Sequence, residues 1–504
     1  MANGGGGLQG LVRLLLEPVA KTPLRTVASE PVMGENYRDV RLALKEVVGG
    51  LQPCPVRSPA AVPAPSEPRG LAASGPLARF VIDVVEELDL DGFYRRRRED
   101  GWGRAAYDPK MTVALLLYAY CTGVRSSRQI ERRLREDVAF RFIAANHCPD
   151  HATVARFRSE HGTVLEGLFV QALRLCVEAG LVRVGMVALD GKRVAADASM
   201  AANKTRAGIE GEVKAMLAEA AATDAAEDAA LGDARGDELP PILADRRSRL
   251  ARLRQAKAHL DDEEQARRDA HDQRMAEREA KELQSGKRLR GRAPALPEPV
   301  KERQANVTDP DSRIMKTQHG FIQGYNGQAV VTEHQIVVAC DLAADPTDVG
   351  LLHPMLEQAQ RNLRTVGVTE PIGVLVADAG YYSDSTASRQ TADGPDLLIA
   401  TAKGWRERKA AQAHPPRGRI PEAFTTRQRM GRKLQTKRGQ RLYRKRSATV
   451  EPVFGQHDTR GLRRLHRRGL DACRSEWSFE NTAHNVLKLW RAGRRAGPKA
   501  DREG

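Results

Sequence analysis

Between residues 78 and 182 the apolar side chains recur at helical spacing. FVIDVVEELDL at 80–90 repeats apolar positions every three or four residues, which predicts an amphipathic helix. MTVALLLYAYCTGV at 111–124 is almost wholly apolar but too short to cross a bilayer, so it predicts a buried helix. Further helices are predicted after Ser126, a good N-cap residue, and over 151–161. These last two resemble a helix-turn-helix, but a plain helical bundle fits the pattern equally well.

From residue 186 the pattern changes to that of strands. MVALD (186–190) is a short apolar run, and KRVAADAS after Gly191 alternates weakly, which predicts two short strands. Strands and helices then follow one another along the chain. We predict strands at 324–333, 335–342, 373–380 and 397–403, and helices at 348–363, from Ser383 and from about Thr449. This order predicts an α/β fold, a mixed sheet with helices on its faces.

Residues 203–305 interrupt the strand pattern. Ala, Glu, Asp, Arg and Lys dominate there, and opposite charges are interleaved from Asp245 to Lys287. Such a composition predicts charged, solvent-exposed helices, so we interpret the segment as an insertion outside the sheet. LQPCPVRSPAAVPAPSEPRG at 51–70 is rich in Pro, Ala and Ser, which predicts a linker.

The chain carries its excess positive charge in one stretch. It has 504 residues, which suggests two or three domains, and a formal net charge of +16. Residues 401–470 contain 21 Lys and Arg against four acids, so this window alone carries +17. A focused basic stretch favours contact with DNA phosphates, and the alternative is a solvated basic loop.

The cysteines exclude a disulfide framework. The six are far apart and form no CxxC pair, as expected of thiols in a cytoplasmic protein. His147, Cys148 and His151 offer three possible zinc ligands within five residues, but no fourth is evident.

Three acids stand where a metal site needs them. Asp190 and Asp378 follow the apolar runs VAL and VLVA, and a buried carboxylate at a strand end is costly unless a cation neutralises it. Glu451 is predicted in the first turn of a helix capped by Thr449, where Pro452 is tolerated. Oxygen ligands alone favour Mg²⁺ or Mn²⁺ over zinc. Two such ions are the usual device for in-line displacement at phosphorus.

Several longer runs carry a family resemblance. The chain resembles a bacterial insertion-sequence transposase of the DDE type, in the group with a helical N-terminal domain before a ribonuclease-H-like catalytic domain. The runs span about residues 78 to 490, and VADAGYYS and VEPVFGQ are the most specific. They are AAYDPKMTVALLLYAYCTGVRSSRQIE, DHATVARFR, VALDGKRVAADAS, NVTDPDSRIMKTQHGFIQGYNGQAVV, VADAGYYS, VEPVFGQ, RGLRRLHRRGL and EWSFENTAHNVLKL.

The resemblance implies that Asp190, Asp378 and Glu451 are the catalytic, metal-binding acids. It places the family's Tyr and Arg before the Glu at Tyr443 and Arg446. The chain departs from the family pattern seven residues after the Glu, where a Lys or Arg is usual and Asp458 stands. Arg460 is the candidate to replace that cation.

The basic residues around Glu451 are the predicted DNA contacts. Those from Arg460 to Arg468 recur at spacings of three and four, which predicts one face of a helix. Their alternative partners are the acids of the 203–305 insertion. The predicted contacts are Lys437, Arg438, Arg441, Tyr443, Arg444, Lys445, Arg446, Arg460, Arg463, Arg464, Arg467 and Arg468.

Together these features predict a DNA transposase using two Mg²⁺ or Mn²⁺ ions. Its partners would be double-stranded DNA, namely terminal inverted repeats and target DNA, and further copies of itself in a homodimer or larger assembly. We expect a cytoplasmic, nucleoid-associated protein without a membrane segment. A nuclease of the same fold without strand transfer, or an inactive DNA-binding copy, are the alternatives.

The predicted domain organisation has five parts. They are a poorly structured extension with its linker (1–77), a helical DNA-binding domain (78–182), a catalytic domain (183–202 and 306–490), the helical insertion (203–305) and a flexible tail (491–504).

Overall fold

The computed structural model describes residues 77–95, 107–231, 249–289, 293–294, 303–390, 394–401 and 418–496. The predicted N-terminal extension and linker therefore lie outside the described residues, as do part of the basic stretch (402–417) and the last eight residues.

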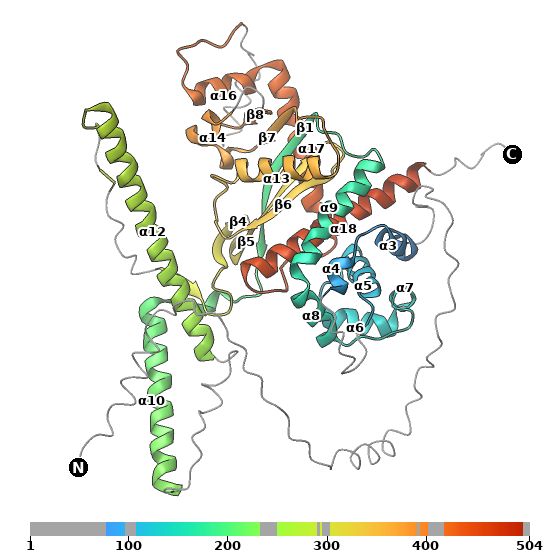
Figure 1. The fold of residues 1–504 in the computed structure, drawn as a ribbon, viewed down its shortest axis with the longest axis vertical. Coiled ribbons are helices and arrows are strands. Elements are labelled where there is room, and N and C mark those ends of the chain that lie inside the picture. Colours follow the sequence, from blue (N-terminus) through green and yellow to red (C-terminus); the bar gives the residue numbers. More distant parts are fainter. Residues whose placement is uncertain are drawn as a thin grey trace, which may run out of the picture. The chain divides into compact units, whose positions relative to one another are not determined.

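The first described part of the chain is helical, as the periodicity predicts (Figure 1). The predicted buried helix is confirmed: Asp108 caps it by accepting a hydrogen bond from the Lys110 N–H at 3.1 Å, Pro109 opens it, and most of its side chains are buried. No helix in the described ranges is long and apolar enough to cross a membrane. The helices are α3 (Leu77–Glu86), α4 (Asp91–Tyr94), α5 (Pro109–Cys121), α6 (Ser127–Glu136), α7 (Val138–Ile143), α8 (His151–Glu160) and α9 (Gly162–Glu178).

A six-stranded mixed sheet follows, confirming the α/β fold class. β1 pairs antiparallel with β5 and parallel with β7, and β7 pairs parallel with β8. The other edge of β5 is long enough to pair with β4 over 320–324 and with β6 over 326–331. The strands are β1 (Met186–Ala195), β4 (Arg313–Thr317), β5 (Gly320–Thr332), β6 (Val337–Ala343), β7 (Val374–Ala377) and β8 (Asp396–Ile399).

The prediction of two short strands on either side of Gly191 is wrong. β1 runs unbroken through Asp190 and Gly191, because β5 pairs with it residue for residue from Val187 to Ala195. Asp190 therefore lies within a strand and not at its end. Gly191 does not interrupt the strand, because the backbone hydrogen bonds to β5 do not depend on a side chain and continue across this residue.

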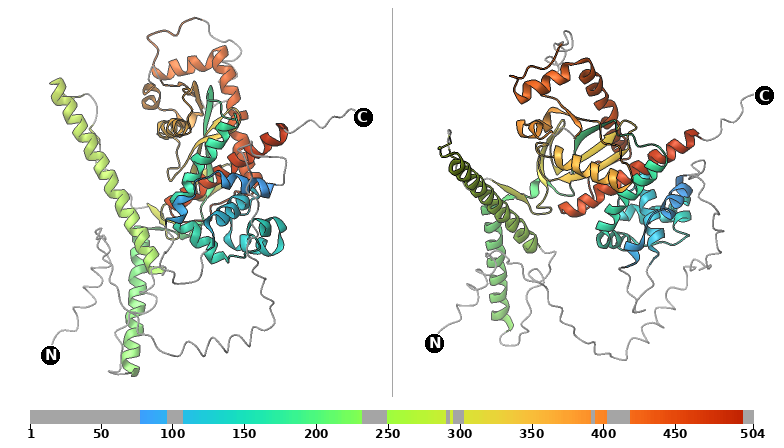
Figure 2. Two further views of the ribbon diagram at one scale, coloured as in Figure 1. Left: turned by 45° about the vertical axis from the view of Figure 1, so that its right-hand side comes forward. Right: turned by 45° about the horizontal axis from the view of Figure 1, so that its top comes forward.

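Helices cover both faces of the sheet (Figures 1 and 2). On one face α13 packs against Leu189 and Leu375, and on the other α17 packs against Ala188 through Val450 and Val453. The Ser383 N-cap is confirmed, since its hydroxyl accepts from the Thr386 N–H at 3.0 Å. These helices are α13 (Leu352–Thr365), α14 (Asp384–Ser388), α16 (Thr426–Gln435), α17 (Lys437–Thr459) and α18 (Leu470–Ala496).

Two boundaries near the C-terminus differ from those predicted. α17 begins at Lys437, not near Thr449, because Thr436 caps it by accepting from the Gly439 N–H at 3.0 Å. α18 continues to Ala496, past the predicted start of a flexible tail at 491.

The inserted segment contains two long helices, α10 (Arg206–Leu231) and α12 (Arg249–Ser285). Two short strands that the sequence pattern did not predict, β2 (Asn203–Thr205) and β3 (Gln304–Asn306), pair and close its base. A small core joins the helices there, formed by Ile209, Val213, Leu250, Leu253, Ala256, Leu260 and Ala305. The segment thus has apolar contacts of its own near its base.

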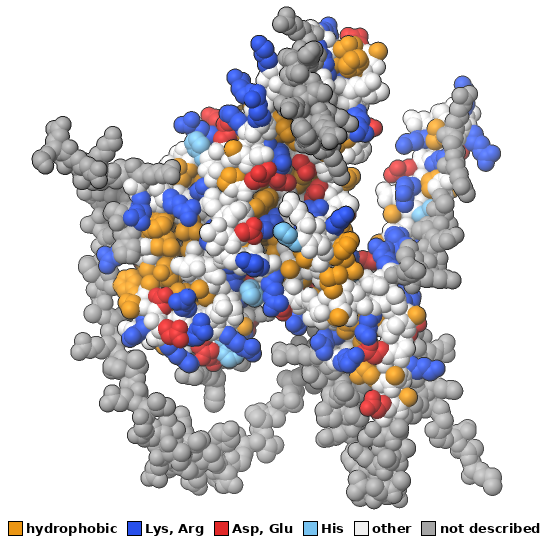
Figure 3. All heavy atoms as spheres, turned by 180° about the vertical axis from the view of Figure 1, so that it is seen from behind, with side chains coloured by type: hydrophobic (Ala, Val, Ile, Leu, Met, Phe, Trp, Pro, Cys, Tyr) orange, Lys and Arg blue, Asp and Glu red, His pale blue; other side chains and the backbone are white. Residues whose placement is uncertain are grey.

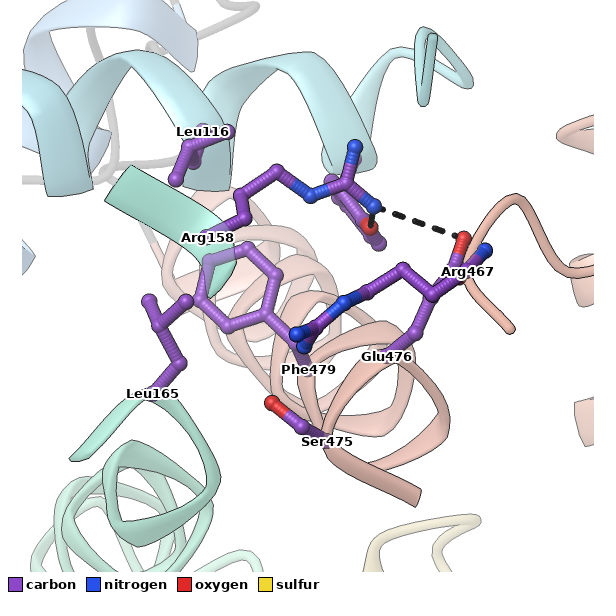
Figure 4. A pocket seen from close by; sticks show the side chains of 8 residues that line it. Leu116, Arg158, Leu165, Arg467, Ser475, Glu476 and Phe479 are labelled. Atoms are coloured by element: carbon purple, nitrogen blue, oxygen red, sulfur yellow. Dashed lines mark hydrogen bonds and ion pairs between the residues drawn. The ribbon is translucent and has the colours of Figure 1, made fainter. Parts of the chain in front are cut away.

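Buried ion pairs join α18 to the N-terminal helices. The Glu480 carboxylate is fully buried and accepts from Arg125 Nε and Nη2 at 2.9 and 3.0 Å and from Arg460 Nη2 at 2.7 Å. One turn earlier, Glu476 lies 3.6 Å from Arg158, which also donates to the Tyr120 hydroxyl at 2.8 Å (Figure 4). Charges withdrawn from water need such partners, so these pairs hold α5, α8 and α18 in one arrangement.

Two buried histidines lie where α17 meets α18. His457 and His484 are both fully buried, with their rings 5.5 Å apart. Burial lowers the pKa of His457 well below its usual range, and the neighbouring His484 and Arg460 add to this. Burial also lowers the pKa of His484 to about 3, although its hydrogen bond to the Gln335 carbonyl works in the opposite direction. Both imidazoles are therefore neutral in the folded protein at neutral pH.

The ion pair of Glu480 gives a first prediction. Glu480→Gln keeps the side-chain size but leaves Arg125 and Arg460 without their buried counter-charge. We expect the free energy of unfolding, measured in urea, to fall by about 3–5 kcal/mol. The matched control is Glu136→Gln, which removes an exposed pair with Arg132 and should cost less than about 1 kcal/mol. Equal small losses in both variants would contradict the structural role of Glu480.

The buried histidines give a second prediction. Because their pKa is depressed by folding, the unfolded chain binds more protons, and stability falls as the pH drops below about 6.5 toward 3. Each histidine contributes a slope of up to about 1.4 kcal/mol per pH unit. Urea unfolding at pH 7 and pH 5 should show this loss, and His457→Leu should reduce it by about half. The exposed control His151→Gln should leave the pH dependence intact.

Candidate active site

Asp190 on β1 and Asp378 at the end of β7 lie side by side, because β1 and β7 are neighbouring parallel strands. Leu189 is in register with Ala377, so Asp190, within β1, lies beside Asp378, the first residue after β7 ends. Adjacent strands are about 4.8 Å apart, and residues in parallel register point to the same face. That face is the one covered by α17, since Ala188 and Val376, two residues before each acid, pack toward that helix.

Helix α17 brings a cation to these acids. Arg446 donates from Nη1 to Asp190 Oδ2 at 2.7 Å, and its Nη2 lies 3.7 Å from Glu451 Oε1. Only 14% of the Arg446 side chain is exposed. The Tyr443 ring lies against the same guanidinium, 6.0 Å from its carbon. Arg446 therefore bridges an acid of the sheet and the acid of the helix.

The site concentrates negative charge. Burial raises the pKa of Asp190, Arg446 works against this, and the neighbouring charge of Asp378 raises the pKa further. Burial disfavours charge on Arg446, but Asp190, Tyr443 and Asp378 together outweigh it and raise the pKa of the guanidinium. A carboxylate in this position favours a cation beside it.

Glu451 lies in the middle of α17, so its predicted place in a first helical turn is wrong. Its side chain is 57% exposed. Pro452 stands inside the helix, where a proline cannot donate to the carbonyl four residues earlier. That carbonyl, of Ala448, accepts instead from Gln335 Nε2 at 3.2 Å. The tertiary contact with Gln335 thus allows the helix to continue through a residue that the sequence marks as a helix start.

Arg446 connects two of the three predicted acids, Asp190 and Glu451, while Asp378 adjoins Asp190 through the register of β1 and β7. Among the described side chains, no three His, Cys, Asp or Glu residues form a group that could hold a metal ion. The donor chemistry nevertheless fits Mg²⁺ or Mn²⁺, since Asp190, Asp378 and Glu451 are all oxygen ligands. Asp190 also has its carboxylate neutralised by a side chain that a cation could replace.

Most predicted DNA contacts on α17 are exposed. Arg438 pairs with Asp396 and Lys445 with Glu333, each at 2.5 Å, although both cations remain at least half exposed. Lys437 and Arg441 are exposed and form no ion pair with any residue that the structure describes, and Arg444 is exposed one turn beyond. Figure 3 shows Lys and Arg spread over one face of the molecule with acidic groups between them, not a single continuous basic surface.

The predicted arginine stripe after Glu451 is not a helix. α17 ends at Thr459 and α18 begins at Leu470, and Arg464 forms a bridge beside Ala195 at the end of β1. Helical spacing in a sequence cannot reveal that Gly461 has a positive φ of 79°, which ends the helix.

The arginines of this segment have different surroundings. Arg460 is 9% exposed and paired with Glu480, so we remove it from the predicted DNA contacts. Arg464 and Arg468 both pair with Asp197, at 3.3 and 2.9 Å, and neither pairs with an acid in the described part of the insertion. Arg463 is exposed and Arg467 half-buried.

Asp458, which stands where the family pattern has a Lys or Arg, has a cation beside it. Lys192 Nζ lies 2.5 Å from Asp458 Oδ1 and 3.4 Å from the Phe454 carbonyl. Lys192 follows Asp190 by two residues on the same strand and so points to the same face. Arg460, predicted to replace the missing cation, is buried elsewhere, and Lys192 supplies the positive charge near that position.

A polar cluster behind the acids was missed by sequence reasoning. Arg193, Asn326, Gln328 and Asp348 share hydrogen bonds on the opposite face of the sheet. The available signal was the spacing of Asn326 and Gln328 by two in GYNGQAVV, which places two polar side chains on one buried face. The three candidate zinc ligands His147, Cys148 and His151 do not form a group that could hold a metal ion. The His151 Nδ1 atom lies 2.7 Å from Glu131 Oε2 instead.

Comparison with protein families agrees with this architecture. A transposase domain family (DUF772) matches residues 72–160, and the transposase DDE domain matches residues 300–486. The second range includes Asp378 and Glu451, whereas Asp190 lies between the two. No curated protein sequence and no solved structure matches the chain. A DDE domain implies a ribonuclease-H-like fold, as the mixed sheet flanked by helices has. The chain belongs to the insertion-sequence transposases of the DDE type.

Proposed function

We propose that this transposase cuts DNA at the ends of its element and joins the freed 3′-OH to target DNA. Asp190, Asp378 and Glu451 would hold two Mg²⁺ or Mn²⁺ ions for both steps. The observation that supports the proposal is the register of β1 and β7, which brings Asp190 beside Asp378, together with Arg446 of α17, which contacts both Asp190 and Glu451. The bound ions would activate the attacking oxygen and stabilise the leaving oxygen.

The chain's own residues contribute position and charge. Asp190 and Asp378 are fixed by a hydrogen-bonded sheet, a rigid support for ligands that must be held closely. Arg446 neutralises Asp190 and is held by it, so this arginine is available to a phosphate once Asp190 binds another cation. Glu451 is exposed on α17 and so is open to an incoming DNA strand.

DNA would approach along α17. Lys437, Arg441 and Arg444 recur at spacings of four and three, so they share one face of this helix. We propose that these residues, with Arg438, Tyr443, Lys445 and Arg446, contact phosphates beside Glu451. Arg463, Arg464, Arg467 and Arg468 stay as further contacts, two of them shared with Asp197. The helical domain would bind the same DNA, and two or more copies of the chain would assemble on the element ends.

Asp458 supports a second candidate, a DNA-binding protein that has lost strand transfer or all cleavage. An acid near the DNA path repels phosphate unless it is neutralised. Lys192 does neutralise it, which favours the active enzyme. A nuclease without strand transfer would cut element ends and give no joined products.

Removing one acid tests the metal-dependent chemistry. Asp378→Asn keeps size and hydrogen bonding but removes a ligand charge. With a plasmid carrying the gene and its flanking DNA, we expect Mg²⁺-dependent cleavage to fall at least about a hundredfold. Substituting a residue that only supports a metal ligand already lowers activity by up to about a hundredfold, and Asp378 would be a ligand itself. DNA binding in EDTA should persist. The control Asp384→Asn, an exposed acid on α14, should cut normally, and full cleavage by Asp378→Asn would refute the assignment.

The salt dependence of binding tests the α17 contacts. Each neutralised phosphate adds about −0.9 to the slope of log K against log salt. Lys437→Ala with Arg441→Ala should flatten the slope by about two units for specific and random duplexes alike. Arg464→Ala with Arg468→Ala is the comparison pair. If only this second pair flattens the slope, DNA lies along the 460–469 segment and not along α17.

A further inference from the structure

Asp348 is a buried acid that the proposed chemistry does not use. It lies in the loop between β6 and α13, and its side chain is 13% exposed. Arg193 contacts both of its carboxylate oxygens at 3.3 Å, and Asn326 and Gln328 donate to Oδ1 at 2.8 and 3.1 Å. Four donor contacts leave this carboxylate satisfied, so its neighbours and not a solvent ion determine its place.

The cluster around Asp348 lies behind the catalytic acids. Successive residues of a strand point to opposite faces, so Gly191 and Arg193 face away from Asp190. Gly191 and Arg193 pair with Gln328 and Asn326 across β5, which brings all four to this face. The sheet therefore has acids on the α17 face and a satisfied polar cluster on the α13 face at the same position.

Two glycines allow Asp348 to lie this close. A Cβ on Gly191 would be 2.9 Å from Asp348 Oδ1, and a Cβ on Gly380 would be 3.0 Å from both Asp348 Oδ2 and Asp378 Oδ1. Asp348 Oδ2 and Asp378 Oδ1 therefore lie no more than twice 3.0 Å from each other. Gly191 directly follows Asp190 and Gly380 follows Asp378 by two residues, so Asp348 touches the backbone that carries each acid.

Tyr381 closes the cluster. It is fully buried, and its hydroxyl donates to Gln328 Oε1. Burial raises the pKa of its phenol well above the usual range, followed by the negative charges of Asp348, Asp190 and Asp378. The phenol thus experiences all three carboxylates and, as a neutral donor, connects the turn after β7 to the middle of β5.

We propose that Asp348, paired with Arg193, is a positioning residue. From the α13 face of the sheet it sets the distance between Asp190 and Asp378 on the opposite face. The Arg193 guanidinium also donates to the Pro346 carbonyl at 2.7 Å, so the pair ties the Asp348 loop to β1. The inference rests on the proposed function, in which Asp190 and Asp378 together hold metal ions. Moving Asp348 would shift the turn at Gly380 and widen the site without removing a ligand.

The test measures Mn²⁺ binding to the full chain from the electron paramagnetic resonance signal of free Mn²⁺. Asp348→Asn should raise the Mn²⁺ dissociation constant about 10- to 100-fold, as loss of supporting residues does. Its affinity for duplex DNA in EDTA should not change. Asp345→Asn is the matched control, since it removes the same charge from an exposed residue of the same loop and should bind Mn²⁺ normally.

A second variant covers misfolding of Asp348→Asn. Gly380→Ala keeps every charge but puts a Cβ 3.0 Å from both Asp348 Oδ2 and Asp378 Oδ1, so these carboxylates must shift. The φ of Gly380 is not positive, so its backbone accepts alanine. It should weaken Mn²⁺ binding likewise.

The outcomes separate the two proposals. If Asp378→Asn abolishes Mn²⁺ binding while folded Asp348→Asn and Gly380→Ala bind as tightly as the unaltered chain, the positioning role of Asp348 is refuted and the proposed function stands. If the unaltered chain shows no saturable Mn²⁺ binding, or Asp378→Asn binds it normally, the proposed function fails and this inference fails with it.

Discussion

The burial of Glu480 is the constraint on which much of the molecule depends. A carboxylate in the interior is stable only with cations and donors around it, and here Arg125 and Arg460 supply them. Arg125 comes from the helical domain and Arg460 from the turn that ends α17, so one acid on α18 fixes both. Because α17 carries Arg446 and Glu451, the network that stabilises the fold also sets where these side chains stand relative to the sheet.

Charge balance then organises the sheet itself. Acids lie at the same position on both of its faces, and each face has its own arginine: Arg446 beside Asp190 and Arg193 beside Asp348. The two pairs differ in how they are satisfied. Asp348 has four donor contacts, whereas Asp190 has the Arg446 guanidinium and one backbone N–H. The less satisfied acid, Asp190, is the one that contacts Arg446 of the helix that carries Glu451.

The departures from the family pattern have a physical explanation in the same region. Asp458 reverses the charge expected after Glu451, but Lys192, two residues after Asp190, lies against it. The positive charge is therefore supplied from β1. This substitution is visible only when strand and helix are brought together, because 266 residues separate the two side chains.

The sequence by itself determined the class of fold, most helices and strands and the transposase family, and it predicted the three acids of the site. These follow from local signals: apolar periodicity, N-cap residues such as Ser383, and short runs such as VADAGYYS. It misplaced Glu451 at a helix start, because α17 continues through Pro452, where the distant Gln335 donates to the carbonyl that the proline leaves without a helical donor. Helical spacing likewise predicted a helix over 460–468, where Gly461 turns the chain and Arg460 is drawn inward by Glu480. Only the tertiary structure decided these points, together with the pairing of Arg446 with Asp190 and the place of Asp348. Contacts between residues far apart in the chain depend on strand register and burial, which no local pattern specifies.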